Sequence, residues 1–285
     1  MATAGERAEK LVVDSDIDGS LVGHFHDLYR GGQPANKGET IMAALMHFAV
    51  EFGKNGGRRL PRAWRCVKSW KRRCPPRSRR PHTSSIWYGL AWELARDQLL
   101  AMAVYTLFMV VTYTRPSEPL GIRRRDLKRP LPGVSRQWHV LLFPEERAGR
   151  SKVLAANDSV EVWAPWAEWI SGACEALAVG NPEEKIFGFS YPEYTKGLAK
   201  AAARLGIDVV PYQARHSGPS IDAARHLRTR AEIRARGRWA SEKSVARYER
   251  PARLAESFQE LPTGVQEFCQ RAEEHFTAAP SSWGA

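Results

Sequence analysis

The sequence predicts a mainly α-helical protein with a small antiparallel β-sheet, an α+β fold in which a small helical domain precedes a larger mixed domain. Three observations support this prediction. Short helical patterns separated by Gly-rich loops, RGGQPANKGE and GKNGGRRLP, occupy residues 11–74. A long apolar stretch follows a basic, Pro-containing segment, and short β-prone runs come after it. A chain of 285 residues is long enough for two such domains.

The helical elements follow from apolar spacing and from their end signals. In the first domain, Leu21, Phe25 and Leu28 recur at helical spacing. The apolar stretch TSSIWYGLAWELARDQLLAMAVYTLFMVVTYTRP begins with hydroxyl residues suited to an N-cap and stops at Pro116, so we expect one central buried helix. Its longest apolar run, residues 99–113, is shorter than the roughly 20 residues that a bilayer requires, and no membrane partner is expected.

The runs WHVLLF, SKVLAA and SVEVWA are β-prone, and the turn signal ND separates the last two, so they predict a small antiparallel sheet. Helices then continue to the end of the chain. EYTKGLAKAAARLGI places Leu198, Ala202 and Leu205 on one face and ends at Gly206, a suitable C-cap.

Near the C-terminus, Thr229 and Glu232 form a capping-box pattern, Gly237 is suited to end that helix, and Pro251 ends the next. The tail LPTGVQEFCQRAEEHF carries a second capping-box pattern at Thr263 and Gln266. Its apolar face comprises Val265, Phe268, Cys269, Ala272 and Phe276.

Cysteine content and the N-terminus indicate an intracellular protein. Cys66, Cys74, Cys174 and Cys269 form no CxxC pair and have no histidine at zinc-ligand spacing, so we interpret them as reduced core thiols. The first residues lack the apolar core of a secretory signal. The compartment, nucleus or nucleoid, is not resolved by the sequence.

The charge balance favours a polyanionic partner. The formal net charge is +12, and the stretch from Lys54 to Arg80 holds twelve Lys or Arg and no acidic residue. A solvated basic face is the ordinary explanation of such a run, but we favour contact with the phosphates of double-stranded DNA. The residues predicted to bind DNA are Arg58, Arg59, Arg62, Arg65, Lys68, Lys71, Arg72, Arg73, Arg77, Arg79 and Arg80.

Four short segments carry residue types suited to phosphate chemistry. In chain order they are TRPSEPLGIRRRDL, GRSKVLAANDSVEV, YQARHSG and GRWASEKSVARYER. Together they resemble the catalytic domain of the tyrosine recombinases, the phage-integrase family. The resemblance covers about residues 85–255, and the basic helical segment before it resembles the core-binding domain of that family.

The resemblance assigns roles to particular residues. Its catalytic positions fall on Arg115, Lys152, Tyr212, Arg215, Trp239 and Tyr248, and its supporting positions on Glu118 and His216. Tyr212 stands where the family usually has histidine, whereas tryptophan is a known alternative at the position of Trp239.

The implied activity is that of a site-specific recombinase or integrase, with a mobile element as its setting. Tyr248 would attack phosphorus to form a covalent 3′-phosphotyrosyl intermediate. Arg115 and Arg215 would bind the non-bridging oxygens, and Lys152 would protonate the leaving 5′ oxygen. This chemistry needs no metal, ATP or other cofactor.

Each residue has an ordinary explanation when taken alone. Arg115 can pair with Glu118, Lys152 can be an exposed hairpin lysine, and Trp239 and Tyr248 can be core aromatics. The order and spacing of the whole set favour the catalytic interpretation. Two other functions stay open: a type IB topoisomerase that relaxes supercoils as a monomer, and a catalytically degenerate DNA-binding relic.

The predicted organisation is a core-binding-like helical domain at 1–74, a basic Pro-rich linker at 75–84, a catalytic domain at 85–255 and a tail helix at 256–285. In the family, such a tail often docks on a neighbouring protomer, so the resemblance implies dimers or tetramers on DNA. Packing of the tail on its own domain is the alternative.

Overall fold

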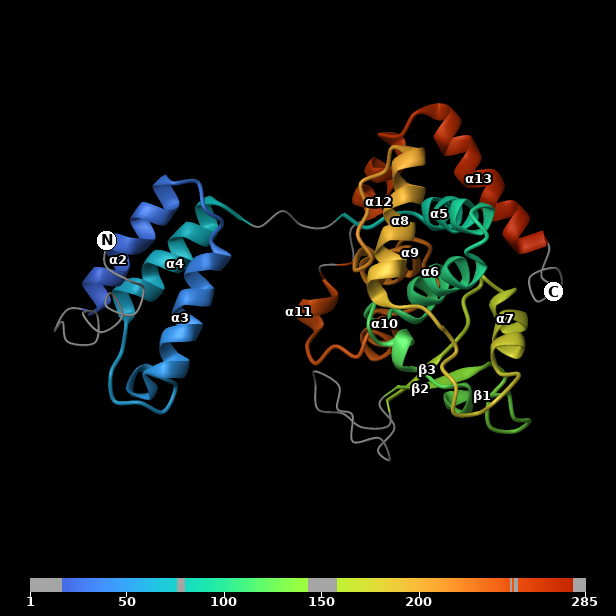
Figure 1. Cartoon of the computed structure of the whole chain (residues 1–285), viewed down its shortest axis with the longest axis horizontal. Helices are drawn as coiled ribbons and strands as arrows, with labels where there is room; N and C mark the ends of the chain where they lie inside the picture. Colours follow the sequence, from blue (N-terminus) through green and yellow to red (C-terminus); the bar gives the residue numbers. More distant parts are fainter. Residues whose placement is uncertain (1–16, 76–79, 143–157, 247, 249–250, 279–285) are drawn as a thin grey trace. The chain divides into compact units, whose positions relative to one another are not determined.

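The computed structural model describes residues 17–75, 80–142, 158–246, 248 and 251–278 (Figure 1). The chain divides into two compact units, Met1–Ser78 and Arg79–Ala285. The first is helical, and the second is mainly helical with a small antiparallel sheet, which confirms the predicted fold class. No helix in the described part of the chain is both long and apolar enough to span a bilayer.

The first unit is built around the apolar faces of its helices. Its elements are α2 (Ile17–Arg30), α3 (Asn36–Phe48), η1 (Val50–Phe52) and α4 (Pro61–Arg73). The predicted stripe on α2 packs inward: Leu21 and Phe25 are buried, and Leu28 packs against the same core. Asp18 links α2 to α4 by accepting hydrogen bonds from the backbone N–H groups of Arg62 (3.0 Å) and Ala63 (2.8 Å), which satisfies the start of α4.

The long apolar stretch of the second unit forms two helices, so the prediction of one central helix is wrong. α5 (Ser84–Arg96) ends at Asp97, and α6 (Leu100–Thr112) begins after a left-handed residue, Gln98, with φ 60°. One continuous helix over this stretch would be roughly 44 Å long. The break lets both halves pack against each other in one core. Apolar composition alone cannot locate such a break.

The sheet has strand order β1-β2-β3 in the described residues, with both pairs antiparallel. WHVLLF supplies β2 (His139–Leu142) and SVEVWA supplies β3 (Asp158–Glu161). SKVLAA lies outside the described residues. Sequence reasoning missed β1 (Leu127–Lys128), because two residues are too few to show alternation.

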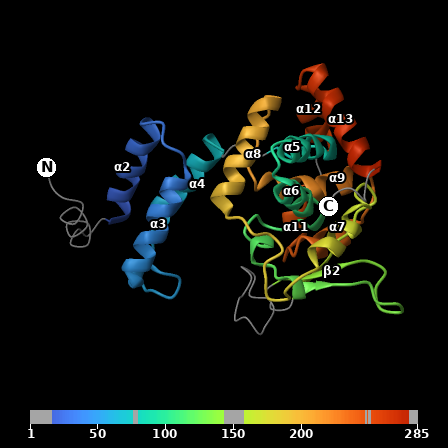
Figure 2. The same ribbon diagram turned by 45° about the vertical axis from the view of Figure 1, so that its right-hand side comes forward.

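The remaining elements surround α5 and α6. They are η2 (Pro119–Gly121), η3 (Arg124–Asp126), α7 (Ile170–Leu177), α8 (Tyr191–Leu205), α9 (Gln213–Ala224), α10 (Arg230–Arg236), α11 (Glu242–Val245), α12 (Pro251–Gln259) and α13 (Thr263–Ala278). In both views α8, α9 and α13 lie around the α5–α6 pair, and the sheet lies below α6 (Figures 1 and 2).

Several predicted helix ends are present. Gly206 ends α8 with φ 64°, as a left-handed C-cap. Thr229 and Glu232 form the predicted capping box at α10, and Gly237 follows that helix. Pro251 comes after α11 and is the first residue of α12, a position where proline has no N–H to leave unpaired.

The tail helix α13 packs on α5 of its own unit. Cys269, Ala272 and Phe276 are buried there, and a Cβ added at Gly89 of α5 would come within 2.6 Å of the Cys269 Sγ. Glu273 accepts hydrogen bonds from Ser84 and Ser85 at the start of α5. The chain therefore accommodates its tail within one copy.

The start of α13 differs from the prediction. The helix begins at Thr263 itself, and the Gln266 side-chain amide donates to the Leu261 carbonyl (2.7 Å). This bond replaces the expected capping box, because Thr263 is already inside the first turn.

The cysteine prediction is correct for two of the four thiols. Cys174 and Cys269 are buried free thiols, whereas Cys66 is half-buried and Cys74 is exposed. Both exceptions belong to α4 or its end, where one helix face points away from the core.

Candidate functional site

The candidate site begins where α6 ends in the second unit. Tyr113 adopts a left-handed conformation (φ 53°) and turns the chain toward Arg115. The backbone N and Nη1 of Arg115 donate to the Glu118 carboxylate at 2.7 and 2.6 Å. The Glu118 side chain is 2% exposed and that of Arg115 is 18% exposed. A buried carboxylate that binds both parts of Arg115 fixes the direction of its guanidinium.

Arg215, in the first turn of α9, is the most deeply buried guanidinium of the site. The residue is 1% exposed. Its Nη1 donates to the Tyr113 carbonyl, and its Nη2 donates to the Gly237 carbonyl at 2.6 Å. Its Cζ lies 5.3 Å from the centroid of the Trp239 ring. Arg215 thus joins the end of α6 to the loop after α10.

Sequence reasoning missed a third guanidinium, that of Arg238. Its Nη2 donates to Oε2 of Glu118 at 2.5 Å, and its side chain is 7% exposed. Arg238 has φ 54°, which is uncommon for a residue with a Cβ. In the sequence, only its position directly before Trp239 could have pointed to Arg238. Its contact with Glu118, 120 residues earlier, leaves no pattern in the sequence.

Positive charge exceeds negative charge around Glu118. Among the described side chains, the guanidinium groups of Arg115, Arg215 and Arg238 meet there with one carboxylate as their common neighbour. Burial lowers the pKa of Arg215 to about 10, and the charge of Arg238 acts in the same direction. Arg215 therefore stays protonated at neutral pH, and the cluster of guanidinium groups is suited to an anion with several oxygen acceptors.

An aromatic stack covers Arg215. The Trp239 and Tyr248 rings lie 4.4 Å apart, at an angle of 23°, and Tyr248 is 7% exposed. The His216 ring lies 5.1 Å from that of Tyr248, and the Tyr212 ring lies 5.3 Å from His216. The ring of Tyr248 therefore has two ring neighbours, the imidazole of His216 and the indole that covers Arg215.

Gly237 makes the position of the indole possible. A Cβ at this residue would come within 2.1 Å of the Trp239 ring, so any other residue would push the ring away. The same glycine supplies the carbonyl that accepts from Arg215.

The structure brings together most of the residues that the sequence predicts for catalysis. They are Arg115, Glu118, Tyr212, Arg215, His216, Trp239 and Tyr248. Lys152 lies outside the described residues. Because Arg215 is 1% exposed and donates to two carbonyls beneath Trp239, a phosphate reaches its guanidinium only after the Trp239 ring moves.

The predicted DNA-binding residues are divided between the two units. Those of the first unit are exposed: Arg58, Arg59, Arg62, Arg65, Lys68, Lys71, Arg72 and Arg73. Arg77 and Arg79 lie outside the described residues. Arg80 belongs to the second unit and pairs with Glu260 at 2.6 Å.

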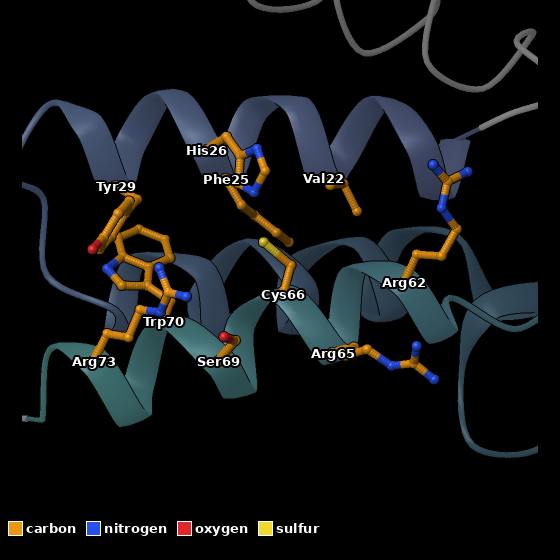
Figure 3. Close-up of a pocket in the computed structure, with 10 residues that line it drawn as sticks. All are labelled: Val22, Phe25, His26, Tyr29, Arg62, Arg65, Cys66, Ser69, Trp70 and Arg73. Atoms are coloured by element: carbon orange, nitrogen blue, oxygen red, sulfur yellow. The ribbon is translucent and has the colours of Figure 1, made fainter.

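A groove of about 360 Å³ lies between side chains of α2 and α4 in the first unit (Figure 3). Arg62, Arg65 and Arg73 project from α4 along this groove. At one end, Trp70 and Tyr29 meet edge to face, with ring centroids 6.3 Å apart. α4 therefore uses its apolar face for the core and presents its basic face to solvent, as in a helix that contacts a polyanion.

Several chains of known structure are similar to this chain. The crystal structure of XerA recombinase aligns with this chain at a TM-score of 0.45 and 14% sequence identity, over 94% of this chain and 96% of that chain. No family model matches the sequence, and no curated protein matches it significantly. A structural similarity of this size carries no information on activity, so function rests on the geometry of the site.

Proposed function

We propose that this chain breaks and rejoins DNA in the manner of a tyrosine recombinase, with Tyr248 as the nucleophile. One observation carries the proposal. Arg115 and Arg238 bind one buried carboxylate, that of Glu118, and Arg215 lies near enough to interact with its charge; the Tyr248 phenol stacks on the indole that covers Arg215. A phenol beside an excess of buried guanidinium groups is suited to attack on a phosphodiester.

In the proposed step, the Tyr248 Oη attacks the phosphorus and the bond from phosphorus to the 5′ oxygen breaks. The products are a 3′-phosphotyrosine and a free 5′-hydroxyl. The phenol gives up one proton and the leaving oxygen gains one, so the step is balanced without a co-reactant. We assign acceptance of the first proton to His216, whose ring centroid lies 5.1 Å from that of Tyr248. We assign delivery of the second to Lys152.

The guanidinium groups stabilise the charge that develops on the non-bridging oxygens. Arg115 and Arg215 have the planar donors that match two of these oxygens. Binding requires the Trp239 ring, which covers Arg215, to move aside, and the phosphate then replaces the carbonyl acceptors of that guanidinium. The reverse reaction restores a phosphodiester, so rejoining needs no external energy source.

Recombination, integration of a mobile element included, is the proposed outcome rather than simple cleavage. The exposed basic face of α4 supplies affinity for duplex DNA through phosphate contacts. Exchange of strands between two duplexes requires more than one copy of the chain, so we expect dimers or tetramers on DNA. Its proposed location is therefore the compartment that holds the DNA, a nucleus or a nucleoid.

The test uses a pool of randomised nicked duplexes from which a short 5′-hydroxyl fragment diffuses away after cleavage. We expect a covalent protein–DNA adduct on a denaturing gel for the wild type and none for Tyr248→Phe. Tyr191→Phe, at an exposed position on α8, is the matched control and keeps the adduct.

Three results would count against the proposal. Retained DNA binding without an adduct leaves a DNA-binding module. An adduct that survives Tyr248→Phe removes the assigned nucleophile. Relaxation of supercoiled DNA without joint products, by a protein that forms the adduct, indicates a topoisomerase.

A further inference from the structure

We propose that Arg238 is a positioning residue, which holds Glu118 and thereby directs Arg115 toward the scissile phosphate. The inference rests on the proposed function and adds a residue to which the resemblance to tyrosine recombinases assigns no role. It depends on three contacts of Glu118 and on the backbone conformation of Arg238.

Glu118 is the shared acceptor of two arginines. Its Oε1 accepts from Nη1 of Arg115 at 2.6 Å, and its Oε2 accepts from the backbone N of Arg115 (2.7 Å) and from Nη2 of Arg238 (2.5 Å). The carboxylate is almost fully buried, so water cannot replace a lost donor at low cost. Removal of the Arg238 guanidinium leaves Glu118 held from the side of Arg115 alone, and the carboxylate then gains freedom to rotate.

The backbone of Arg238 performs a second task. Its φ of 54° reverses the chain between Gly237 and Trp239. On one side of this turn, the Gly237 carbonyl accepts from Arg215, and on the other side the Trp239 ring covers the same guanidinium. Tyr113, the other left-handed residue of the site, also gives its carbonyl to Arg215. Two left-handed turns thus enclose Arg215, and Arg238 connects one of them to Glu118.

The pairing with Glu118 argues against a direct role of Arg238 on the substrate. Nη2 of Arg238 is directed at the carboxylate, and the side chain is more buried than that of Arg115. Arg115 has the most exposed side chain of the three guanidinium residues, so it is the one that a phosphate meets first. Arg238 acts on the reaction through Glu118 and Arg115.

Substitutions at position 238 separate the side chain from the backbone. Glycine adopts positive φ without strain, so Arg238→Gly keeps the turn and removes the side chain with its guanidinium. Arg238→Lys keeps the charge at the same position. Arg234→Ala, at a more exposed arginine of α10, is the matched control.

The adduct assay then measures the rate of cleavage by each variant. We expect Arg238→Gly to lower the cleavage rate about 10²-fold, a loss typical of a displaced catalytic group, with little change in DNA affinity. Arg238→Lys restores part of this rate, and Arg234→Ala matches the wild type. A full wild-type rate for Arg238→Gly would overturn the proposal, because the turn alone would then suffice.

A double-mutant cycle distinguishes positioning from direct contact. In an Arg115→Ala background, Arg238→Gly has no further effect on the rate if it acts through Arg115. If the two losses multiply, Arg238 contacts the phosphate independently and the assignment as a positioning residue is wrong.

A measurement without DNA keeps this inference separate from the proposed function. The guanidinium N–H signals of Arg115, assigned in NMR spectra by their loss in Arg115→Lys, report how firmly Glu118 holds that side chain. We expect faster hydrogen exchange at Arg115 in Arg238→Gly and unchanged exchange in Arg234→Ala. Unchanged exchange in Arg238→Gly overturns the positioning role, whether or not the wild type forms an adduct. Absence of the wild-type adduct overturns the proposed function alone.

Discussion

The two units use arginine in opposite ways. On α4 of the first unit, the arginines are exposed and project into solvent. In the second unit, Arg115, Arg215 and Arg238 are largely buried and donate to carboxylate or carbonyl acceptors. An exposed charge attracts any polyanion over about 8 to 10 Å and tolerates movement. A buried guanidinium attracts distant polyanions less, but its N–H groups point in fixed directions.

Burial alone does not make an arginine part of the site. Arg236 is as buried as Arg238, but it donates to the carbonyls of Val111, Glu161 and Trp163 and so joins α10 to α6 and the sheet. Burial lowers its pKa to about 10. Arg236 pairs with Glu161 and lies over the ring of Tyr113, whereas the candidate site gathers Arg115 and Arg238 on Glu118.

The largest expected difference is between the effects of replacing one arginine in each unit, Arg215 in the second and Arg65 in the first. Arg215→Ala should lower the adduct rate by about 10³-fold, as does the loss of a donor to a developing oxyanion. It should also lower the free energy of unfolding by about 2 kcal/mol, because the carbonyls of Tyr113 and Gly237 lose their donor. Arg65→Ala should change stability by less than about 0.5 kcal/mol. Rate assays and urea denaturation measure both; equal effects of the two substitutions would contradict the comparison.

Charge removal on α4 should weaken DNA binding without altering the fold. Replacing Arg62, Arg65 and Arg72 by glutamine should reduce the slope of log affinity against log salt by about 3 and lower affinity on the order of 10²-fold at physiological salt. Gel retardation over a salt series measures the slope. Arg253→Gln, on α12 of the second unit, is the control, and an identical slope in both variants would remove α4 from the DNA interface.

A buried histidine is expected to make the stability of the second unit depend on pH. His82 contacts Gln213 in the second unit, and burial lowers its pKa to about 4. The folded pKa is below the ordinary value of about 6.5, so the unfolded chain binds the proton more tightly. Neutral His82 therefore makes its full contribution to the free energy of unfolding above about pH 6.5. This contribution falls as the pH drops toward 4, by roughly 3 kcal/mol in total.

Hydrogen exchange of second-unit peptides in urea, at pH 7 and pH 5, measures this loss. His82→Asn removes the titrating group, so its stability should fall less between the two pH values than that of the wild type. Equal losses in both proteins would show that other groups cause the acid sensitivity.

Two glycines in different surroundings are expected to change stability in opposite directions. A Cβ at Gly218 of α9 would meet the Val110 carbonyl at 2.1 Å, whereas a Cβ at Gly23 of α2 meets nothing within 4 Å. Gly218→Ala should therefore destabilise the second unit by about 1 to 3 kcal/mol. Gly23→Ala should stabilise the first by about 0.5 to 1 kcal/mol. Thermal unfolding checks the signs, and stabilisation by Gly218→Ala would show that α9 and α6 can separate.

Local signals predicted local structure well. The stripe on α2, the capping box at Thr229 and the left-handed end of α8 at Gly206 all depend on residues within a few positions of one another. The break at Gln98 was missed because an apolar run has the same composition whether it forms one helix or two. Arg238 was missed because its partner, Glu118, is distant in the sequence.

The sequence by itself determined the mainly helical fold class, the basic character of α4 and the order of the residues suited to phosphate chemistry. These properties are additive along the chain or repeat with the period of a helix. Only the tertiary structure decided that Arg115 and Arg238 meet at Glu118 with Arg215 nearby, and that Trp239 covers Arg215 and stacks on Tyr248. Such contacts join segments that are distant in the sequence and meet only in the folded chain. Burial strengthens their hydrogen bonds and makes an unpaired polar group costly, so only one arrangement of these side chains is stable.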